Sequence, residues 1–289
     1  MAFAKEVRTV NSFTDWIESF ESGTRLTRST KAVLHAIAAD PEEAAYCSAQ
    51  ALANIAGVNV ATVVRTAQAL GFSGWPAFSA EIRSRYLASL TSRNVYIHNR
   101  SQGISATAID KDIELLEHLR SSLDESALRR MAEHIGAAAS TGVFATGAYS
   151  APGVQLAHIG QMLGYPIRCH SGSATSMINE VRLLRQGDCF LAFSLWKSSR
   201  IVLQVAEVAK QQGVKICVIA DRHTALTGIA DEYVLVPTET TQVISSLVCA
   251  TSAVQILLGL IAKRDESRTH RMLEQIDTLW ELTAVVAEE

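Results

Sequence analysis

The sequence lacks an excess of positive charge. Its 289 residues include 26 lysines and arginines against 29 aspartates and glutamates, which gives a formal net charge of −3. A protein with this balance has no global attraction to nucleic acid, so any DNA-binding surface must be local. Hydrophobic residues make up 48% and charged residues 19% of the chain. These proportions are typical of a well-packed globular protein and exclude a disordered one.

The sequence also lacks the motifs of metal, cofactor and nucleophile chemistry. It contains no Walker glycine loop, no GxGxxG, no nucleophile elbow and no CxxC. Five scattered cysteines indicate reduced, mostly buried thiols in a cytoplasmic protein. His158, His170 and His223 have no metal-ligand spacing. We therefore expect no metal, no cofactor and no catalytic residue.

The sequence has few segments that a membrane could accept. The start, "MAFAKEVRTV", has no apolar core of a signal peptide. Residues 243–262, "VISSLVCATSAVQILLGLIA", are uncharged and long enough to span a bilayer, but they contain three serines, a threonine and a glutamine. We expect a helix buried in a core or a subunit interface, and no membrane partner.

Residues 11–90 carry only helical signals. Phe13, Trp16, Ile17 and Phe20 share one helical face, and Val33, Leu34 and Ile37 share another. Residues 91–107 then lose this periodicity and gather Ser, Thr, Asn and Gly, as a linker does. The pattern predicts an all-α domain over 1–90, followed by a linker and connecting helix over 91–125.

From residue 126 short apolar runs alternate with amphipathic helices. The runs are "TGVFATG", "YPIRCHS", "DCFLAFS", "VKICVIAD" and "DEYVLVPT". Such alternation predicts βαβ units and a doubly wound parallel sheet with helices on both faces, over residues 126–262. Residues 263–289 form a last amphipathic helix, which packs on its own domain or on a partner subunit.

Residues 51–78, "ALANIAGVNVATVVRTAQALGFSGWPAF", fit a helix-turn-helix. Two helices that cross closely need a small residue at the crossing, a left-handed turn residue and an apolar anchor on the second helix. Ala53, Gly57 and Val63 supply these in that order. Asn59 is then a good N-cap for the second helix. A plain helical hairpin in a bundle is the alternative that the spacing alone leaves open.

The second helix has an outward side suited to DNA. We expect contacts to bases and phosphates from one set of residues, in which Ala61 can meet a thymine methyl. These residues are Asn59, Ala61, Thr62, Arg65, Gln68, Ser73 and Arg83.

The stretch closely resembles the N-terminal signature of RpiR-type transcriptional regulators. In that family an Ala-Gly-Val-Ser turn leads into Ala-Thr-Val…Arg and then Leu-Gly-Phe-x-Gly. The match runs without a gap from Leu52 to Phe78, with Asn59 where serine is usual. The resemblance implies DNA binding and a C-terminal SIS (sugar isomerase) domain, a flavodoxin-like α-β-α sandwich that usually binds phosphosugars.

Ligands of such sheets lie beyond the carboxyl ends of the strands, where strand order reverses. The loops after the first three strands, and one after the last, are therefore the candidate effector site, with hydroxyls and helix amides to hold a phosphate. For any single serine, helix capping is the simpler interpretation. The candidates are Gly147, Tyr149, Ser150, Ser171, Ser173, Ser194, Lys197, Ser198, Ser199 and Glu239.

Two of these loops depart from the SIS pattern. The usual Gly-x-Gly-x-Ser is here "ATGAY", with Tyr149 at the serine position, and the usual Ser-x-Ser-Gly-x-Thr is "SLWKSS". Trp196 and Lys197 thus replace Ser-Gly, and a Cβ closes the near approach of a ligand to the backbone. Either Lys197 and the serines still hold an anion, or Tyr149 and Trp196 fill or reshape the site.

The sequence thus favours a cytoplasmic, homo-oligomeric transcriptional regulator that binds a double-stranded operator and a phosphosugar-like effector, controls carbohydrate catabolism and is not an enzyme. Two alternatives stay open. One is a sugar-phosphate isomerase with a helical appendage, in which Glu239 would be the acid/base group that isomerases of this fold carry. The other is an adaptor whose α/β domain binds no ligand.

Overall fold

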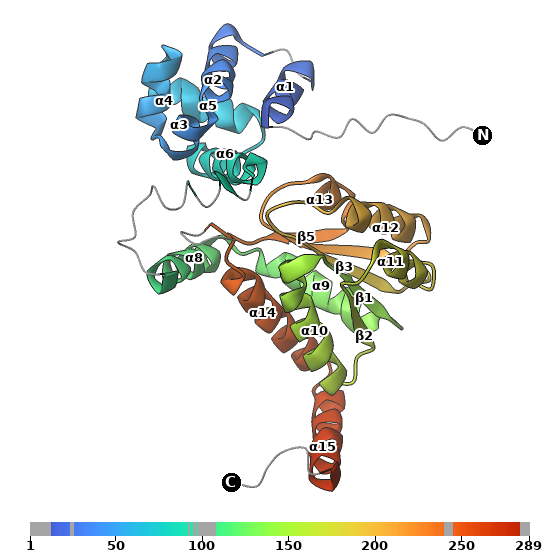
Figure 1. The fold of residues 1–289 in the computed structure, drawn as a ribbon. Coiled ribbons are helices and arrows are strands. Elements are labelled where there is room, and N and C mark those ends of the chain that lie inside the picture. The colour runs from blue at the N-terminus through green and yellow to red at the C-terminus, as the bar shows by residue number, and fades with distance from the viewer. Residues whose placement is uncertain are drawn as a thin grey trace, which may run out of the picture. The chain divides into compact units, whose positions relative to one another are not determined.

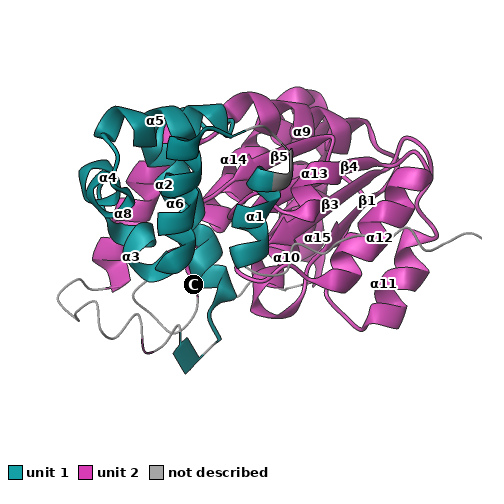
Figure 2. Ribbon diagram, turned by 90° about the horizontal axis from the view of Figure 1, so that it is seen from above, with its two compact units in different colours: residues 1–95 teal, residues 96–289 magenta. Residues whose placement is uncertain are grey.

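The computed structural model describes residues 13–23, 26–91, 93–94, 97, 108–239 and 245–283. The chain divides into two compact units, residues 1–95 and 96–289 (Figure 2). Each unit has a hydrophobic core of its own.

The first unit is built of helices, as the sequence predicts. They are α1 (Phe13–Gly23), α2 (Arg28–Ala39), α3 (Pro41–Tyr46), α4 (Ala49–Ala56), α5 (Val60–Ala69) and α6 (Trp75–Ser89) (Figure 1). The expected faces of α1 and α2 point inward, with Trp16, Val33 and Ile37 all buried. Phe78 is fully buried at the centre of this core, where its ring packs against those of Trp16 and Phe72.

The second unit contains a five-stranded parallel sheet. Its strands are β1 (Thr141–Phe144), β2 (Ile167–His170), β3 (Cys189–Ser194), β4 (Lys215–Ala220) and β5 (Glu232–Leu235), one in each predicted apolar run. Their spatial order is β2-β1-β3-β4-β5, which is the flavodoxin-like order. Every residue of β1 and β3 is buried, since helices cover both faces of the sheet. The predicted fold class is therefore confirmed.

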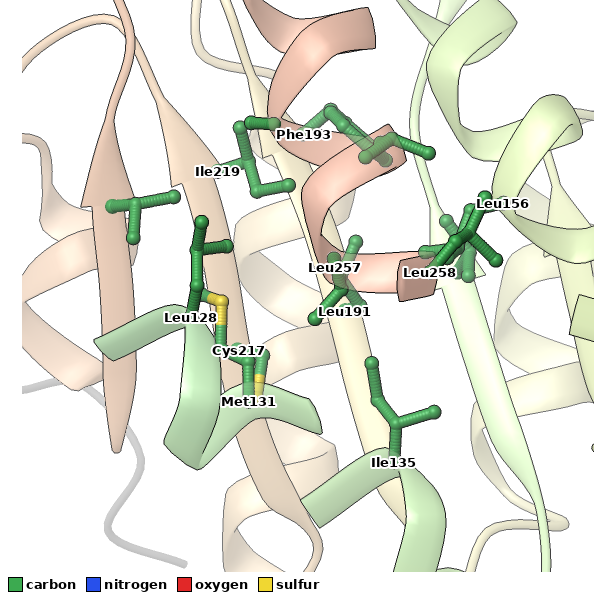
Figure 3. Close-up of a cluster of buried hydrophobic side chains, with 14 of the residues drawn as sticks. Leu128, Met131, Ile135, Leu156, Leu191, Phe193, Cys217, Ile219, Leu257 and Leu258 are labelled. Carbon is green, nitrogen blue, oxygen red and sulfur yellow. The ribbon is translucent and has the colours of Figure 1, made fainter. Parts of the chain in front are cut away.

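Two helical layers cover this sheet. On one face α9 (Glu125–Ala137), α10 (Ala151–Met162) and α14 (Val248–Arg264) enclose the larger core (Figure 3). Two buried leucines of α8 (Ala108–Ser122) belong to the same core. On the other face lie α11 (Ala174–Val181), α12 (Arg200–Gln211) and α13 (Ala225–Ile229). Alternate residues of β3 and β4 supply the two cores, as the pleat of a strand dictates.

The helix predicted over the uncharged run 243–262 begins later than expected. Residues 245–247 are not helical, residues 243–244 lie outside the described residues, and α14 begins at Val248. Its inner face is buried, with Ala253, Leu257 and Ile261 fully inaccessible. No helix in the described part of the chain is long and apolar enough to cross a membrane.

The last described helix is α15 (Glu266–Thr283). It is attached to its own unit near its start, where the Arg268 guanidinium lies over the Tyr165 ring at 4.2 Å and donates to the carbonyl of Gly164. Farther along, Leu279 and Leu282 are exposed. The helix thus packs on its own unit at one end only.

Candidate functional site

The turn between α4 and α5 has the geometry that a helix-turn-helix needs. Gly57 ends α4 in the left-handed conformation, with φ 65° and ψ 35°. A residue with a Cβ is strained there, which is why glycine is favoured. The Val58 amide then donates to the carbonyl of Ala53, and Ala53 and Val63 are fully buried where the helices meet. All three residues therefore fill the predicted roles.

Asn59 begins the second helix of the pair. Its Oδ1 accepts a hydrogen bond from the Thr62 amide at 2.8 Å and another from the Thr62 hydroxyl at 2.9 Å. The side chain thus satisfies one of the amides that a helix leaves unpaired at its start. The predicted N-cap is confirmed.

Replacing this cap tests its contribution to the fold. We expect Asn59→Ala to lower the free energy of unfolding of the first unit by about 1 kcal/mol, since alanine cannot accept from the Thr62 amide. Urea denaturation followed by helical circular dichroism measures the loss. Asn59→Ser, which keeps an accepting oxygen, is the control. An equal loss in both variants would contradict the capping role.

One side of α5 is open to solvent. Asn59, Ala61, Arg65 and Gln68 are exposed, whereas Thr62 is half-buried. The Arg65 side chain lies along its own helix, with Nε donating to the carbonyl of Ala61 at 3.2 Å. The opposite side of the helix, with Val63 and Ala67 inaccessible, anchors it to the core. These exposed residues can therefore reach a duplex without disturbing the packing.

The basic residues of α6 are bound within the unit. Arg83 Nε donates to the carbonyl of Ala45 at 3.0 Å, and its guanidinium lies 4.9 Å from the centre of the Tyr46 ring. Arg85 pairs with the buried Glu81 at 2.7 Å. Ser73, just before α6, is exposed. Arg83 thus links α6 to α3, so of the predicted DNA-contacting arginines Arg65 is the more accessible.

In the second unit the strand order reverses between β1 and β3. After β1 the short helix η1 (Gly147–Ser150) begins at Gly147 with φ 59°, and the Ser150 hydroxyl donates to the Gly147 carbonyl at 2.8 Å. Tyr149 is half-buried against the larger core. Burial raises the pKa of the Tyr149 hydroxyl, and the nearby charge of Asp221 raises it further.

After β3 the loop places Trp196 toward Tyr149. The two ring centres are 6.4 Å apart. Lys197 lies over the indole, with Nζ 5.0 Å from its centre, and the buried Ser194 hydroxyl shares a hydrogen bond with Ser198 at 3.1 Å. Ser199 stands at the N-cap of α12 without a side-chain capping bond. The structure therefore brings the loops after β1 and β3 into contact at Tyr149 and Trp196.

The buried carboxylate of Asp221 connects the loops that follow β4 and β5 to the loop after β3. This residue was not among those predicted from the sequence. Asp221 follows β4, and its Oδ2 accepts from the Trp196 amide at 2.6 Å and from the Thr238 hydroxyl at 3.3 Å. Its Oδ1 accepts from the Arg222 guanidinium at 2.8 Å. The side chains of Asp221 and Arg222 are only 5% and 9% exposed. A polar pair directly after the apolar run "VKICVIA" was the available signal.

The remaining predicted residues lie apart from this cluster or at its edge. Ser171 and Ser173 follow β2, on the far side of β1 from β3. Ser173 caps α11 by accepting from the Ser176 amide, which is the simpler role considered for such serines. Glu239 is half-buried after β5, next to residues that are not described. At the end of β2, burial lowers the pKa of His170 despite Glu180 at 3.9 Å.

The first unit is similar to known helix-turn-helix proteins. Residues 17–89 match the model of the rpiR-family helix-turn-helix domain. The chain is also 36% identical over 78 residues to the "Uncharacterized HTH-type transcriptional regulator YfhH" of Escherichia coli K12. That alignment covers 27% of this chain and 28% of the relative, so the chain matches less than a third of that relative's length.

Two solved structures are similar in fold, one to part of the chain and the other to nearly all of it. The sugar isomerase domain of an RpiR transcription factor from Sphaerobacter thermophilus superposes with a TM-score of 0.58 at 23% identity, covering 61% of this chain and 98% of that one. The Vibrio vulnificus NanR protein, complexed with ManNAc-6P, superposes with a TM-score of 0.59 at 16% identity. That comparison covers 96% of this chain and 100% of the NanR chain. Residues 17–89 therefore match a helix-turn-helix domain of the rpiR family, and in this chain they are joined to an α/β unit with the fold of a sugar isomerase domain.

Proposed function

We propose that this chain is a sequence-specific transcriptional regulator whose second unit senses a phosphorylated sugar. The observation that carries the proposal is the open side of α5, with Asn59, Ala61, Arg65 and Gln68 exposed behind the Gly57 turn. A second helix that projects in this way is the one that enters the major groove. Because the net charge is −3, binding rests on this local surface.

In this proposal Asn59, Ala61, Arg65 and Gln68 contact base edges, while Thr62 and Ser73 contact the backbone. Arg83 acts by fixing α6 to α3, through its bond to Ala45. The protein is a cytoplasmic dimer or tetramer, because two recognition helices read half-sites one helical turn apart. Its operators adjoin genes of carbohydrate catabolism, as the resemblance to RpiR-type regulators implies.

The effector binds at the carboxyl ends of β1 and β3, where the strand order reverses. In this proposal Lys197, Ser198 and Ser199, which directly precede α12, supply a positive charge and hydroxyl groups for a phosphate. The other proposed ligand residues are Gly147, Tyr149 and Ser150 in η1, Ser194 at the end of β3 and Glu239 after β5. Ser171 and Ser173, after β2, offer further hydroxyls, although Ser173 also caps α11. The NanR neighbour is complexed with ManNAc-6P, which belongs to the proposed class.

Binding rather than turnover is the proposed role of the second unit. The effector shifts the arrangement of two subunits and thereby the spacing of their recognition helices, so that effector and operator affinities are linked. An isomerase would instead convert a sugar phosphate and lose turnover in Glu239→Ala. The regulator binds the same sugar without converting it.

Selection of duplexes from a genomic fragment library tests DNA binding. At a stated salt concentration we expect wild type to enrich one inverted-repeat sequence. Arg65→Ala should bind that duplex roughly 10- to 100-fold more weakly, since it loses a charged contact in the groove. Arg129→Ala, an exposed arginine on α9, removes the same charge from the second unit and should behave as wild type. Enrichment of nothing by wild type, with or without phosphosugars, would refute the proposal.

A further inference from the structure

The backbone of Trp196 is unusual. Among the residues that the structure describes, it is the only one other than glycine with positive φ, at 60°. A bulky side chain is disfavoured in this left-handed region, and such residues persist only where their surroundings hold them. Here the Asp221 carboxylate accepts from the Trp196 amide at 2.6 Å and fixes the conformation.

The indole of Trp196 is unfavourably placed as well. Its Nε1 is buried and has no hydrogen-bond partner among the described residues. A buried tryptophan normally finds an acceptor for this N–H. A side chain that merely filled a core would have an ordinary backbone and a satisfied N–H. Two unfavourable features in one residue therefore indicate a resting position that another state can relieve.

That resting position closes the site of the proposed effector. The Trp196 and Tyr149 rings come from the loops after β3 and β1 and meet where the strand order reverses. Ring centres 6.4 Å apart are in contact, so no sugar or phosphate lies between them. Lys197, which the proposed function assigns to the phosphate, is held over the indole at 5.0 Å.

We propose that Trp196 is a gate over the effector site. With its ring against Tyr149 the gate is closed, and Asp221 is the positioning residue that holds it so. When the ring moves away, the indole N–H is released from its unsatisfied position and Lys197 is freed for the anion. The inference rests on the proposed function, because it concerns access to the same site. A gate of this kind weakens the apparent affinity by the fraction of molecules that are open.

Two substitutions of Trp196 distinguish the effect of its ring from the effect of its strained backbone. Trp196→Gly removes the ring and tolerates φ 60°, whereas Trp196→Ala removes the ring but keeps a Cβ in the left-handed region. Without ligand, we expect the glycine variant to melt about 3 °C above the alanine variant. Equal melting temperatures would mean that the loop relaxes away from this conformation and that the strain does not exist.

Binding to the full chain is measured by calorimetry with ManNAc-6P and with inorganic phosphate as probes. Both variants should bind ManNAc-6P at least roughly tenfold more tightly than wild type. Trp280→Phe on α15 is the control for tryptophan loss and should match wild type. Equal affinity in wild type and both variants would overturn the gate while the effector function stands. Weaker binding by the variants would make Trp196 a ligand contact and overturn it too. No binding by any protein would overturn the gate and the effector site together.

Discussion

Asp221→Ala should destabilise the second unit more than any other single change at its strand ends. It leaves the Arg222 guanidinium, 9% exposed, without its carboxylate, and it removes the acceptor of the Trp196 amide and the Thr238 hydroxyl. Breaking a buried ion pair on one side costs about 3–5 kcal/mol. For a unit of this size that loss lowers the melting temperature by on the order of 10 °C.

Scanning calorimetry of the full chain measures this effect, because the transition of the second unit should shift while that of the first unit stays. Asp221→Asn is the matched control. Its amide oxygen still accepts from the Trp196 amide, so the shift should be smaller. A shift of less than 2 °C in Asp221→Ala would show that the carboxylate does not hold these three loops together.

Phe78→Ala should unfold the first unit selectively. Phe78 is fully buried and its ring packs against those of Trp16 at 6.1 Å, Phe72 at 4.8 Å and Trp75 at 6.1 Å. Truncating such a residue costs about 3–5 kcal/mol, which is a large share of the stability of a small helical domain. DNA binding should therefore be lost although no predicted DNA contact is changed.

Hydrogen exchange read peptide by peptide checks this expectation. Protection should fall across α2, α4 and α5 and remain unchanged in β3 and β4, since those strands lie in the core of the other unit. Ile55→Ala, on the exposed side of α4, is the control and should keep both protection and DNA binding. A loss of protection in both units would contradict their independence.

The parts of this protein that sequence predicts best are those fixed by neighbours along the chain. The Gly57 turn and the Asn59 cap each depend on residues within five positions, and both are confirmed. The five strands were recognisable because each is a short apolar run bounded by polar residues. Ser173 was predicted as a ligand residue, but its capping bond to the Ser176 amide is equally local.

The contacts that the sequence could not predict join residues far apart in the chain. Arg83 bonds to a carbonyl 38 positions away, which the composition of α6 does not reveal. Asp221 meets the Trp196 amide across 25 positions, and only the strand order places the two loops side by side. The substitution of Trp196 for the usual serine was visible in the sequence, but its left-handed backbone and its bond to Asp221 were not.

The linkage between the two units is the central claim, and operator affinity measured with and without effector tests it most directly. Fluorescence anisotropy of the selected duplex, at one fixed salt concentration, gives the Kd of wild type in the absence and presence of saturating ManNAc-6P or another phosphosugar that binds. We predict a change of at least about fivefold, since coupling free energies between sites are typically 1–3 kcal/mol. An unchanged Kd with every phosphosugar that binds the second unit would contradict the account.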